Sequence, residues 1–177
     1  MLFTERSIWT MIHGIGLGGT ALMALAAVLF AMYLMRRSYL RATEGEDVSG
    51  PVAALMWLTA AALWLTALVG TYIIFPPYRA AAPEGTTLLA QYPRTMLLAD
   101  PETAWLHTFA METKEHLPWI AAMLATAVAF VAWRYRAEFF RDPRLYRMGA
   151  ILVTVCLAAV AYISLLGVFI NKVAPLQ

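Results

Sequence analysis

The stretch SIWTMIHGIGLGGTALMALAAVLFAMYLM, from Ser7 to Met35, decides the fold class of this chain. It contains no charged residue, and it exceeds the ~20 apolar residues that a helix needs to cross a bilayer. It is also longer than the apolar core of a signal peptide, which spans ~7–15 residues. We therefore predict a transmembrane helix over about residues 8–35.

Three further uncharged runs follow, and the whole composition agrees with them. Of the 177 residues, 62% are hydrophobic and 14% are charged, whereas soluble domains are about half apolar and a quarter charged. The sequence predicts an all-α integral membrane protein, a single domain over residues 1–177 that forms an up-down-up-down four-helix bundle. The three further spans are expected at about residues 51–75, 117–134 and 148–171.

A long connection outside the membrane is expected between the second and third spans. The pair Pro76-Pro77 is expected to end the second span, because proline breaks the helical hydrogen-bond pattern. Residues 76–104 then form a segment outside the membrane, and connections of this length are often functional. We expect this outer segment to fold over one membrane face or to dock a partner.

A helical lead-in is expected before the third span. Asp100 can cap a helix, Pro101 suits its first position, and Glu102 complements the positive end of the helix dipole. The expected helix is amphipathic and lies on the membrane surface from Pro101 to His116. Pro118 is expected to kink the chain where the third span begins.

The basic residues predict the orientation. Eight of the thirteen lysines and arginines lie in the connections that follow the first and third spans. The positive-inside rule places these connections in the cytoplasm. Both termini and residues 76–104 are then outside, so we expect a multi-pass protein of the bacterial inner membrane, with both termini on the periplasmic side. The histidines His13, His107 and His116 all fall near the outer face.

Two of these histidines are candidate haem ligands. His13 in the first span and His116 at the start of the third lie at similar depth, and helical bundles hold cofactors with side chains from facing helices. Haem iron accepts neutral imidazoles as axial ligands. Small residues beside His13, such as Gly16, let a flat cofactor approach the backbone. Basic side chains that are expected to pair with the haem propionates are Arg79, Arg94 and Lys114.

His107 requires a different role. It is nine positions from His116, so on a straight helix the two side chains point to opposite sides at ~100° per residue. His107 is expected to serve a second site or to hydrogen-bond a propionate, a quinone or a partner. It is also a candidate, with Glu112 and Glu115, to carry a proton released by a quinol.

Two other interpretations use the same part of the chain. Glu112, Glu115 and His116 supply the carboxylates and imidazole that bind zinc, iron or manganese, which suggests a non-haem metal site at the outer face. Alternatively, the protein is a haem-free membrane anchor or scaffold subunit, and residues 76–104 dock its partner. The one cysteine, Cys156, lies in an apolar run and is expected to be a small core residue.

The first span also carries a family resemblance. His13 followed by the glycine pair Gly18-Gly19 resembles the small four-helix membrane proteins of the copper-resistance D and HemJ-like groups. The overall plan is similar to that of four-helix b-type cytochrome subunits of respiratory enzymes. The likeness covers mainly the first helix and the four-span plan, and it implies haem b and membrane redox work, with His13 as the residue carried over.

Together these patterns favour a membrane b-type cytochrome subunit with His13 and His116 as axial ligands. It is expected to transfer electrons between the quinone pool and an extrinsic or membrane-bound redox subunit. The expected surroundings are membrane lipid, haem b and quinone. Nothing in the sequence suggests binding to nucleic acid.

Overall fold

The computed structural model describes residues 4–41 and 49–174 of the chain. All regular secondary structure in this part is helical. Four of its helices are long and apolar enough to cross a membrane, which supports a multi-pass membrane protein. They are Glu5–Leu40, Gly50–Arg79, Leu106–Tyr135 and Pro143–Val173.

Several spans consist of more than one helical type. In chain order the segments are α1 (Glu5–Met11), the π-helix η1 (Ile12–Gly18), α2 (Gly19–Arg41), α3 (Gly50–Val69), the π-helix η2 (Gly70–Ile74), α4 (Phe75–Arg79), the 3₁₀ turn η3 (Leu89–Gln91), α5 (Pro93–Leu98), the π-helix η4 (Leu106–Met111), α6 (Glu112–Tyr135), α7 (Ala137–Arg141) and α8 (Pro143–Val173).

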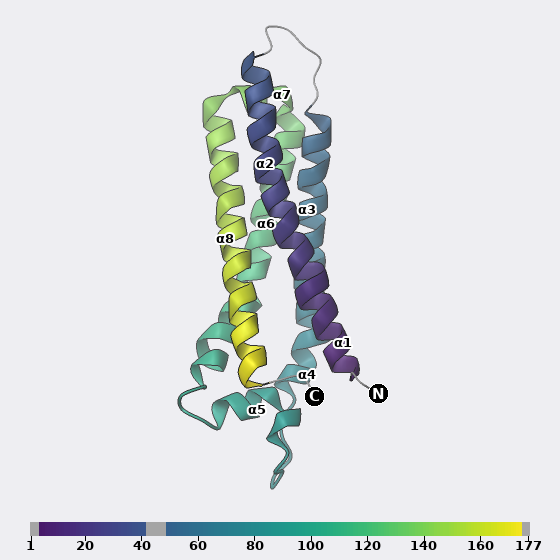
Figure 1. Cartoon of the computed structure of the whole chain (residues 1–177), viewed down its shortest axis with the longest axis vertical. Helices are drawn as coiled ribbons and strands as arrows, with labels where there is room; N and C mark the ends of the chain where they lie inside the picture. Colours follow the sequence, from purple (N-terminus) through teal and green to yellow (C-terminus); the bar gives the residue numbers. More distant parts are fainter. Residues whose placement is uncertain (1–3, 42–48, 175–177) are drawn as a thin grey trace.

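The four long helices pack as a bundle in which each has two neighbours. α3 packs against α2 and α6, and α8 packs against the same two helices from the other side. The described ends of the chain lie at one end of the bundle together with α4 and α5, while α7 lies at the opposite end (Figure 1). For brevity we call these the α5 end and the α7 end.

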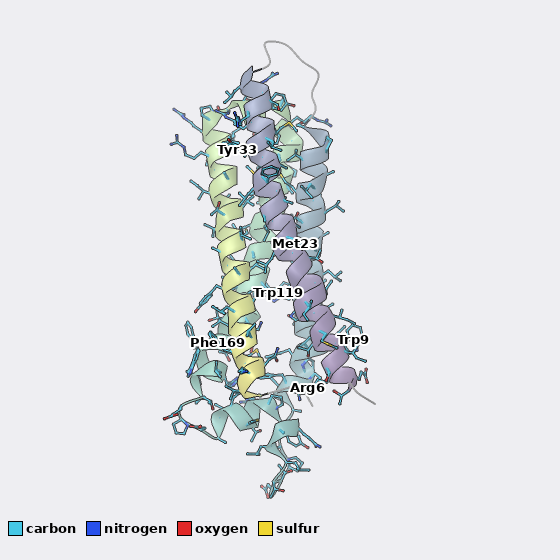
Figure 2. All side chains as sticks on the ribbon, viewed as in Figure 1. Arg6, Trp9, Met23, Tyr33, Trp119 and Phe169 are labelled. Atoms are coloured by element: carbon cyan, nitrogen blue, oxygen red, sulfur yellow. The ribbon has the colours of Figure 1, made fainter. Side chains whose placement is uncertain are left out.

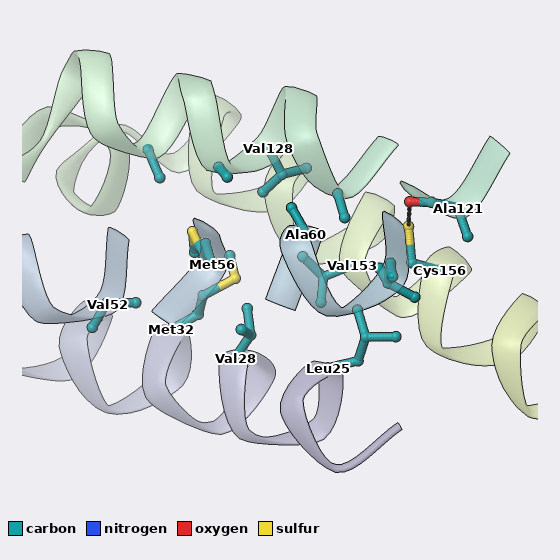
Figure 3. Close-up of a cluster of buried hydrophobic side chains, with 14 of the residues drawn as sticks. Leu25, Val28, Met32, Val52, Met56, Ala60, Ala121, Val128, Val153 and Cys156 are labelled. Atoms are coloured by element: carbon teal, nitrogen blue, oxygen red, sulfur yellow. Dashed lines mark hydrogen bonds between the residues drawn. The ribbon is translucent and has the colours of Figure 1, made fainter. Parts of the chain in front are cut away.

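An apolar core fills the bundle from its middle to the α7 end. All four long helices contribute to it, and its members interdigitate as shown in Figure 3. Cys156 is buried there, and its thiol donates to the carbonyl of Ala121 at 3.6 Å. The expectation that this cysteine is a small core residue is confirmed.

Large apolar side chains also cover the outside of the bundle. Ile15 and Met23 are 77% and 75% exposed, and Phe30 is 64% exposed. Side chains such as Met23 and Phe169 project away from the bundle axis (Figure 2). An outer surface of this kind is stable against lipid rather than water.

The second span is longer than the sequence predicted. Pro76-Pro77 does not end it at residue 75, because the helix continues as α4 to Arg79. The prolines fall in the first turn of α4, where a missing N–H is tolerated. The π-helix η2 immediately before them resets the hydrogen-bond register.

The third span begins earlier than the predicted residue 117, at Leu106, and the helix leading into it begins later than the predicted Pro101. Residues Asp100 to Ala104 form hydrogen-bonded turns, in which Asp100 Oδ1 accepts from the backbone N–H of Glu102 at 2.9 Å. The helix itself starts as η4 and runs without interruption through Pro118 to Tyr135. Residues 106–116 are helical as predicted, but they continue directly into the third span, so a separate lead-in helix on the membrane surface is not confirmed.

The fourth span starts earlier than predicted, at Pro143 instead of Met148. The Asp142 carboxylate accepts from the backbone N–H groups of Arg144 and Leu145, at 2.7 and 2.9 Å. These hydrogen bonds hold the pKa of Asp142 below its ordinary value. A charge-stabilised cap of this kind fixes where the helix begins.

Candidate functional site

Three of the four spans change from α- to π-helix at the α5 end of the bundle. η1 contains His13, η2 begins at Gly70, and η4 contains His107. π-helical turns inside α-helices are rare and are frequent at functional sites. The segments are also in contact with their neighbours, since η1 packs on α3 and η4 packs on α8.

The His13 side chain points into the bundle toward the second span. A β-carbon on Gly70 would lie 2.8 Å from His13 Cε1 and 3.3 Å from Nε2, so only glycine leaves room for this ring. The Nδ1 atom of His13 is buried and has no hydrogen-bond partner among the described residues. A buried imidazole nitrogen without a partner is costly, and in the tautomer that carries its hydrogen on Nε2 this nitrogen can bind a ligand.

Lys114 also points inward, from α6 toward α8. Its ammonium group donates to the carbonyl of Ile163 at 3.2 Å, and a β-carbon on Gly167 would lie 2.8 Å from Nζ. The positive charge is close enough to act electrostatically on His13. No carboxylate of the described residues forms an ion pair with Lys114. The interior thus holds a cation that has no anion of its own.

His13, Lys114 and Glu115 define what we call the polar layer. On one side of it lies the main core, whose nearest members on the first and third spans are Ala21 and Ala121. On the other side a second, smaller apolar cluster closes the α5 end of the bundle. Ionisable residues at such a level in a membrane bundle are costly and are functional candidates.

A hydrogen-bond network lies beyond this layer, at the α5 end. His107 is buried, Tyr78 Oη is 2.9 Å from its Nδ1, and Arg94 Nε donates to its Nε2 at 3.3 Å. A guanidinium group can only donate, so Nε2 accepts and Nδ1 carries the hydrogen. His107 is therefore neutral and donates to Tyr78, which leaves the phenolic hydrogen of Tyr78 free for another acceptor.

Two carboxylates lie close enough to this network to act electrostatically on it. Glu115 and Glu112 both act electrostatically on Tyr78, as do Arg94 and Arg79. Glu115 Oε1 is buried, and no hydrogen-bond donor among the described residues reaches it. The arrangement therefore brings a phenol, an imidazole and carboxylates into one region, and side chains of these types can relay protons.

His116 lies outside both groups. It is exposed, and its Nδ1 is 2.8 Å from the carbonyl of Glu112, one turn earlier on the same helix. A carbonyl only accepts, so Nδ1 carries a hydrogen, and Nε2 is the ring nitrogen that is left for another partner. No hydrogen bond of the described residues joins His116 to His13, and it is Lys114, two positions earlier, that enters the bundle near His13.

The remaining predicted site residues are distributed around the same end. Arg94 contacts His107 as described, whereas Arg79 is exposed and lies over the ring of Phe75, with 4.9 Å between Cζ and the ring centre. Gly16 is exposed, and a β-carbon there would meet nothing within 4 Å. The glycine that makes room for His13 is Gly70, in the second span.

The non-haem metal interpretation requires several ligands at one point. Among residues 4–41 and 49–174, no group of three or more histidine, cysteine, aspartate or glutamate side chains comes together to hold a metal ion. Glu112, Glu115 and His116 are neighbours in sequence, but they do not converge in this structure.

Sequence reasoning missed two residues of the site and gave a third another role. Gly70 and Gly167 lie in apolar runs, and nothing in the pattern marks them as contacts of His13 and Lys114. Tyr78 was expected to contact a docked partner, whereas in the structure it lies against His107. One signal was available, since a glycine in the middle of a long apolar helix weakens it and often marks close packing.

Comparisons with known proteins add no relative. The chain matches no known family model, and no curated protein or solved structure shows significant similarity to it.

Proposed function

We propose that the protein is a membrane b-type cytochrome subunit that transfers electrons between the quinone pool and a redox partner. The observation that carries this proposal is His13, an interior imidazole whose Nδ1 lacks a partner and whose ring occupies the space left by Gly70. It lies in a polar layer between two apolar clusters, where an imidazole nitrogen without a partner is costly.

The surrounding side chains suit a haem. Haem b supplies one-electron transfer when it is bound, and its propionates require positive charge. Lys114 is an interior cation without an anionic partner, and Arg94 is half-buried on the outer segment. In this proposal His13 is an axial ligand, and Lys114 and Arg94 pair with the propionates, with Arg79 at the rim.

His116 is the second ligand expected from sequence. Its position in the structure supports this role less well than the position of His13 does. Nε2 of the neutral ring suits a metal ligand, because metal-bound histidines commonly donate their other N–H to a carbonyl. Its side chain, however, is exposed on the outside of α6. A haem held by both His13 and His116 would therefore require α6 to turn here.

A reduced-minus-oxidised absorption spectrum with a pyridine haemochrome assay tests the proposal. Wild-type protein made with adequate haem is expected to show a sharp b-type band, and His13→Ala is expected to abolish it. His116→Ala abolishes the band if His116 is the second ligand, whereas His107→Ala leaves haem bound. A flat wild-type spectrum would rule out the cytochrome proposal. Retained haem in His13→Ala would rule out His13 as an axial ligand.

The Tyr78, His107 and Arg94 network gives the quinone part of the proposal its physical basis. Oxidation of a quinol releases protons, which need acceptors that connect to water. The hydrogen bond between Tyr78 and His107, together with Glu112 and Glu115 nearby, offers such a path at the α5 end. Tyr78→Phe should slow quinol-dependent reduction of the haem while leaving reduction by dithionite unchanged.

The outer segment is the proposed docking surface for the redox partner. Leu88 and Leu98 are 63% and 42% exposed, and they lie between the second and third candidate spans. Exposed apolar residues outside the lipid region favour contact with a partner protein. The same observation supports the alternative function, a haem-free anchor subunit, which predicts a colourless protein whose partner is lost on Leu88→Asp.

The proposal includes an orientation in the bacterial inner membrane. The arginine-rich connections at the α7 end would be cytoplasmic by the positive-inside rule. The helices would then run up-down-up-down, with both termini on the periplasmic side. A C-terminal alkaline phosphatase fusion should be active and a C-terminal green fluorescent protein fusion dark. The reverse result would show the opposite orientation and would leave the haem proposal unaffected.

A further inference from the structure

A surface groove at the α7 end, far from the polar layer, is formed by α8 and the end of α2. Its volume is about 500 Å³, and no carboxylate lines it. The lining residues are Arg36, Pro143, Tyr146, Arg147, Ala150, Ile151, Thr154 and Val155.

One end of this groove carries two positive charges. The guanidinium group of Arg36 donates from Nη1 to the carbonyls of Phe140 and Arg141, and it lies over the ring of Tyr146 at 5.2 Å. These contacts fix its position, but they neutralise none of its charge. Arg147 is exposed and forms no ion pair with a carboxylate of the described residues.

The rest of the groove is apolar and runs along the fourth span. Ile151 and Val155 are 54% and 49% exposed, and the small side chain of Ala150, also on α8, lines the groove beside them. Tyr146 lies between the two parts, and aromatic side chains are enriched at membrane–water interfaces. The groove is thus cationic toward α7 and apolar along α8.

We propose that this groove binds one anionic phospholipid, with its phosphate on Arg36 and Arg147 and an acyl chain against Ala150, Ile151 and Val155. Arginine binds phosphate oxygens through paired hydrogen bonds, and basic pockets between transmembrane helices recognise anionic headgroups. The Asp142 carboxylate is close enough to act electrostatically on Arg36, but no such group among the described residues acts on Arg147. A second transmembrane helix would cover the apolar part of the groove but would leave Arg147 without a counter-charge. A free anion would bind the arginines but would make no favourable contact with the apolar part of the groove.

Native mass spectrometry of the full chain tests this proposal. Delipidated protein is mixed with phosphatidylglycerol, phosphatidylethanolamine or inorganic phosphate in separate samples. Wild-type protein is expected to retain phosphatidylglycerol in preference to phosphatidylethanolamine and to retain no phosphate. Arg147→Gln should weaken phosphatidylglycerol binding by about fivefold, the contribution of one basic residue near an anionic lipid surface.

Two further variants separate this site from general surface charge. Thr154→Phe fills the apolar part and keeps both arginines, so it should also weaken retention of phosphatidylglycerol. Arg134→Gln removes an exposed arginine outside the groove and should leave retention unchanged. Equal losses in Arg134→Gln and Arg147→Gln, equal retention of the two lipids, or retention of phosphate alone would each overturn the proposal.

Discussion

The ring of His13 lies directly against the backbone of Gly70, where a β-carbon would stand 2.8 Å from Cε1. The first and second spans approach each other at this level because residue 70 has no side chain. The position of His13 therefore depends on a residue that is 57 places away in the sequence and belongs to another helix.

Gly70→Ala should displace the His13 ring. A rigid ring cannot move aside as a flexible chain would, so we expect a net loss of stability from overpacking of roughly 1–3 kcal/mol, reduced by the better helix propensity of alanine. If His13 binds haem, the haem-to-protein ratio should fall in the same variant. Thermal unfolding and a haemochrome assay measure the two effects.

Gly16→Ala is the matched control for this change. A β-carbon at position 16 meets nothing within 4 Å, so the variant should keep its haem and gain about 0.5–1 kcal/mol from the reduced entropy of the unfolded chain. A haem loss equal to that of Gly70→Ala would show that the contact with His13 is not what matters.

Tyr78→Phe should destabilise the α5 end of the bundle. The change leaves Nδ1–H of His107 without its 2.9 Å partner in a buried position, and an unsatisfied buried donor costs roughly 1–3 kcal/mol. Chemical unfolding in detergent measures the loss. Tyr72→Phe removes the same hydroxyl from a side chain that is 69% exposed, and a comparable loss there would argue against the network.

Lys114→Met separates a functional role from a structural one. The interior ammonium has a carbonyl partner but no anion, so an apolar side chain of similar length should leave stability unchanged or raise it. If Lys114 faces a haem propionate, the same variant should lower the midpoint potential of the haem, because a nearby positive charge favours the reduced form.

Redox titration and thermal unfolding measure both properties of Lys114→Met. The control is Lys172→Met, which removes an exposed lysine in the last turn of α8 and should leave the potential where it was. Equal midpoint potentials in the wild type and in Lys114→Met would show that Lys114 does not lie near a haem propionate.

Arg36→Gln should loosen the α7 end. Arg36 ties α2 to α7 through the carbonyls of Phe140 and Arg141, and hydrogen bonds from charged groups contribute about 1.5–3 kcal/mol. Hydrogen exchange at α7 should rise in this variant. Arg37→Gln removes a hydrogen bond and a ring contact with the exposed Tyr33 on the same helix, and it should leave exchange at α7 unaltered.

The four spans could be predicted from the sequence, because a chain in lipid must satisfy its backbone within each helix and therefore needs an uninterrupted apolar run. Ser7 to Met35 meets that requirement without reference to any other part of the chain. The core position of Cys156 followed in the same way from the run around it. Exact helix ends were harder. An unforeseen π-helix lies just before Pro76-Pro77, and hydrogen-bonded turns follow Asp100 before the π-helix that starts the third span.

The tertiary structure alone decided which ionisable side chains enter the bundle. Sequence reasoning paired His13 with His116 by depth, but depth does not define direction around a helix. Each residue turns the helix by ~100°, so the π-helix η4 changes the direction of every side chain that follows it. Through that change and the space at Gly167, Lys114 points inward and His116 outward. Such packing depends on the facing helices, whose contacts no local pattern contains.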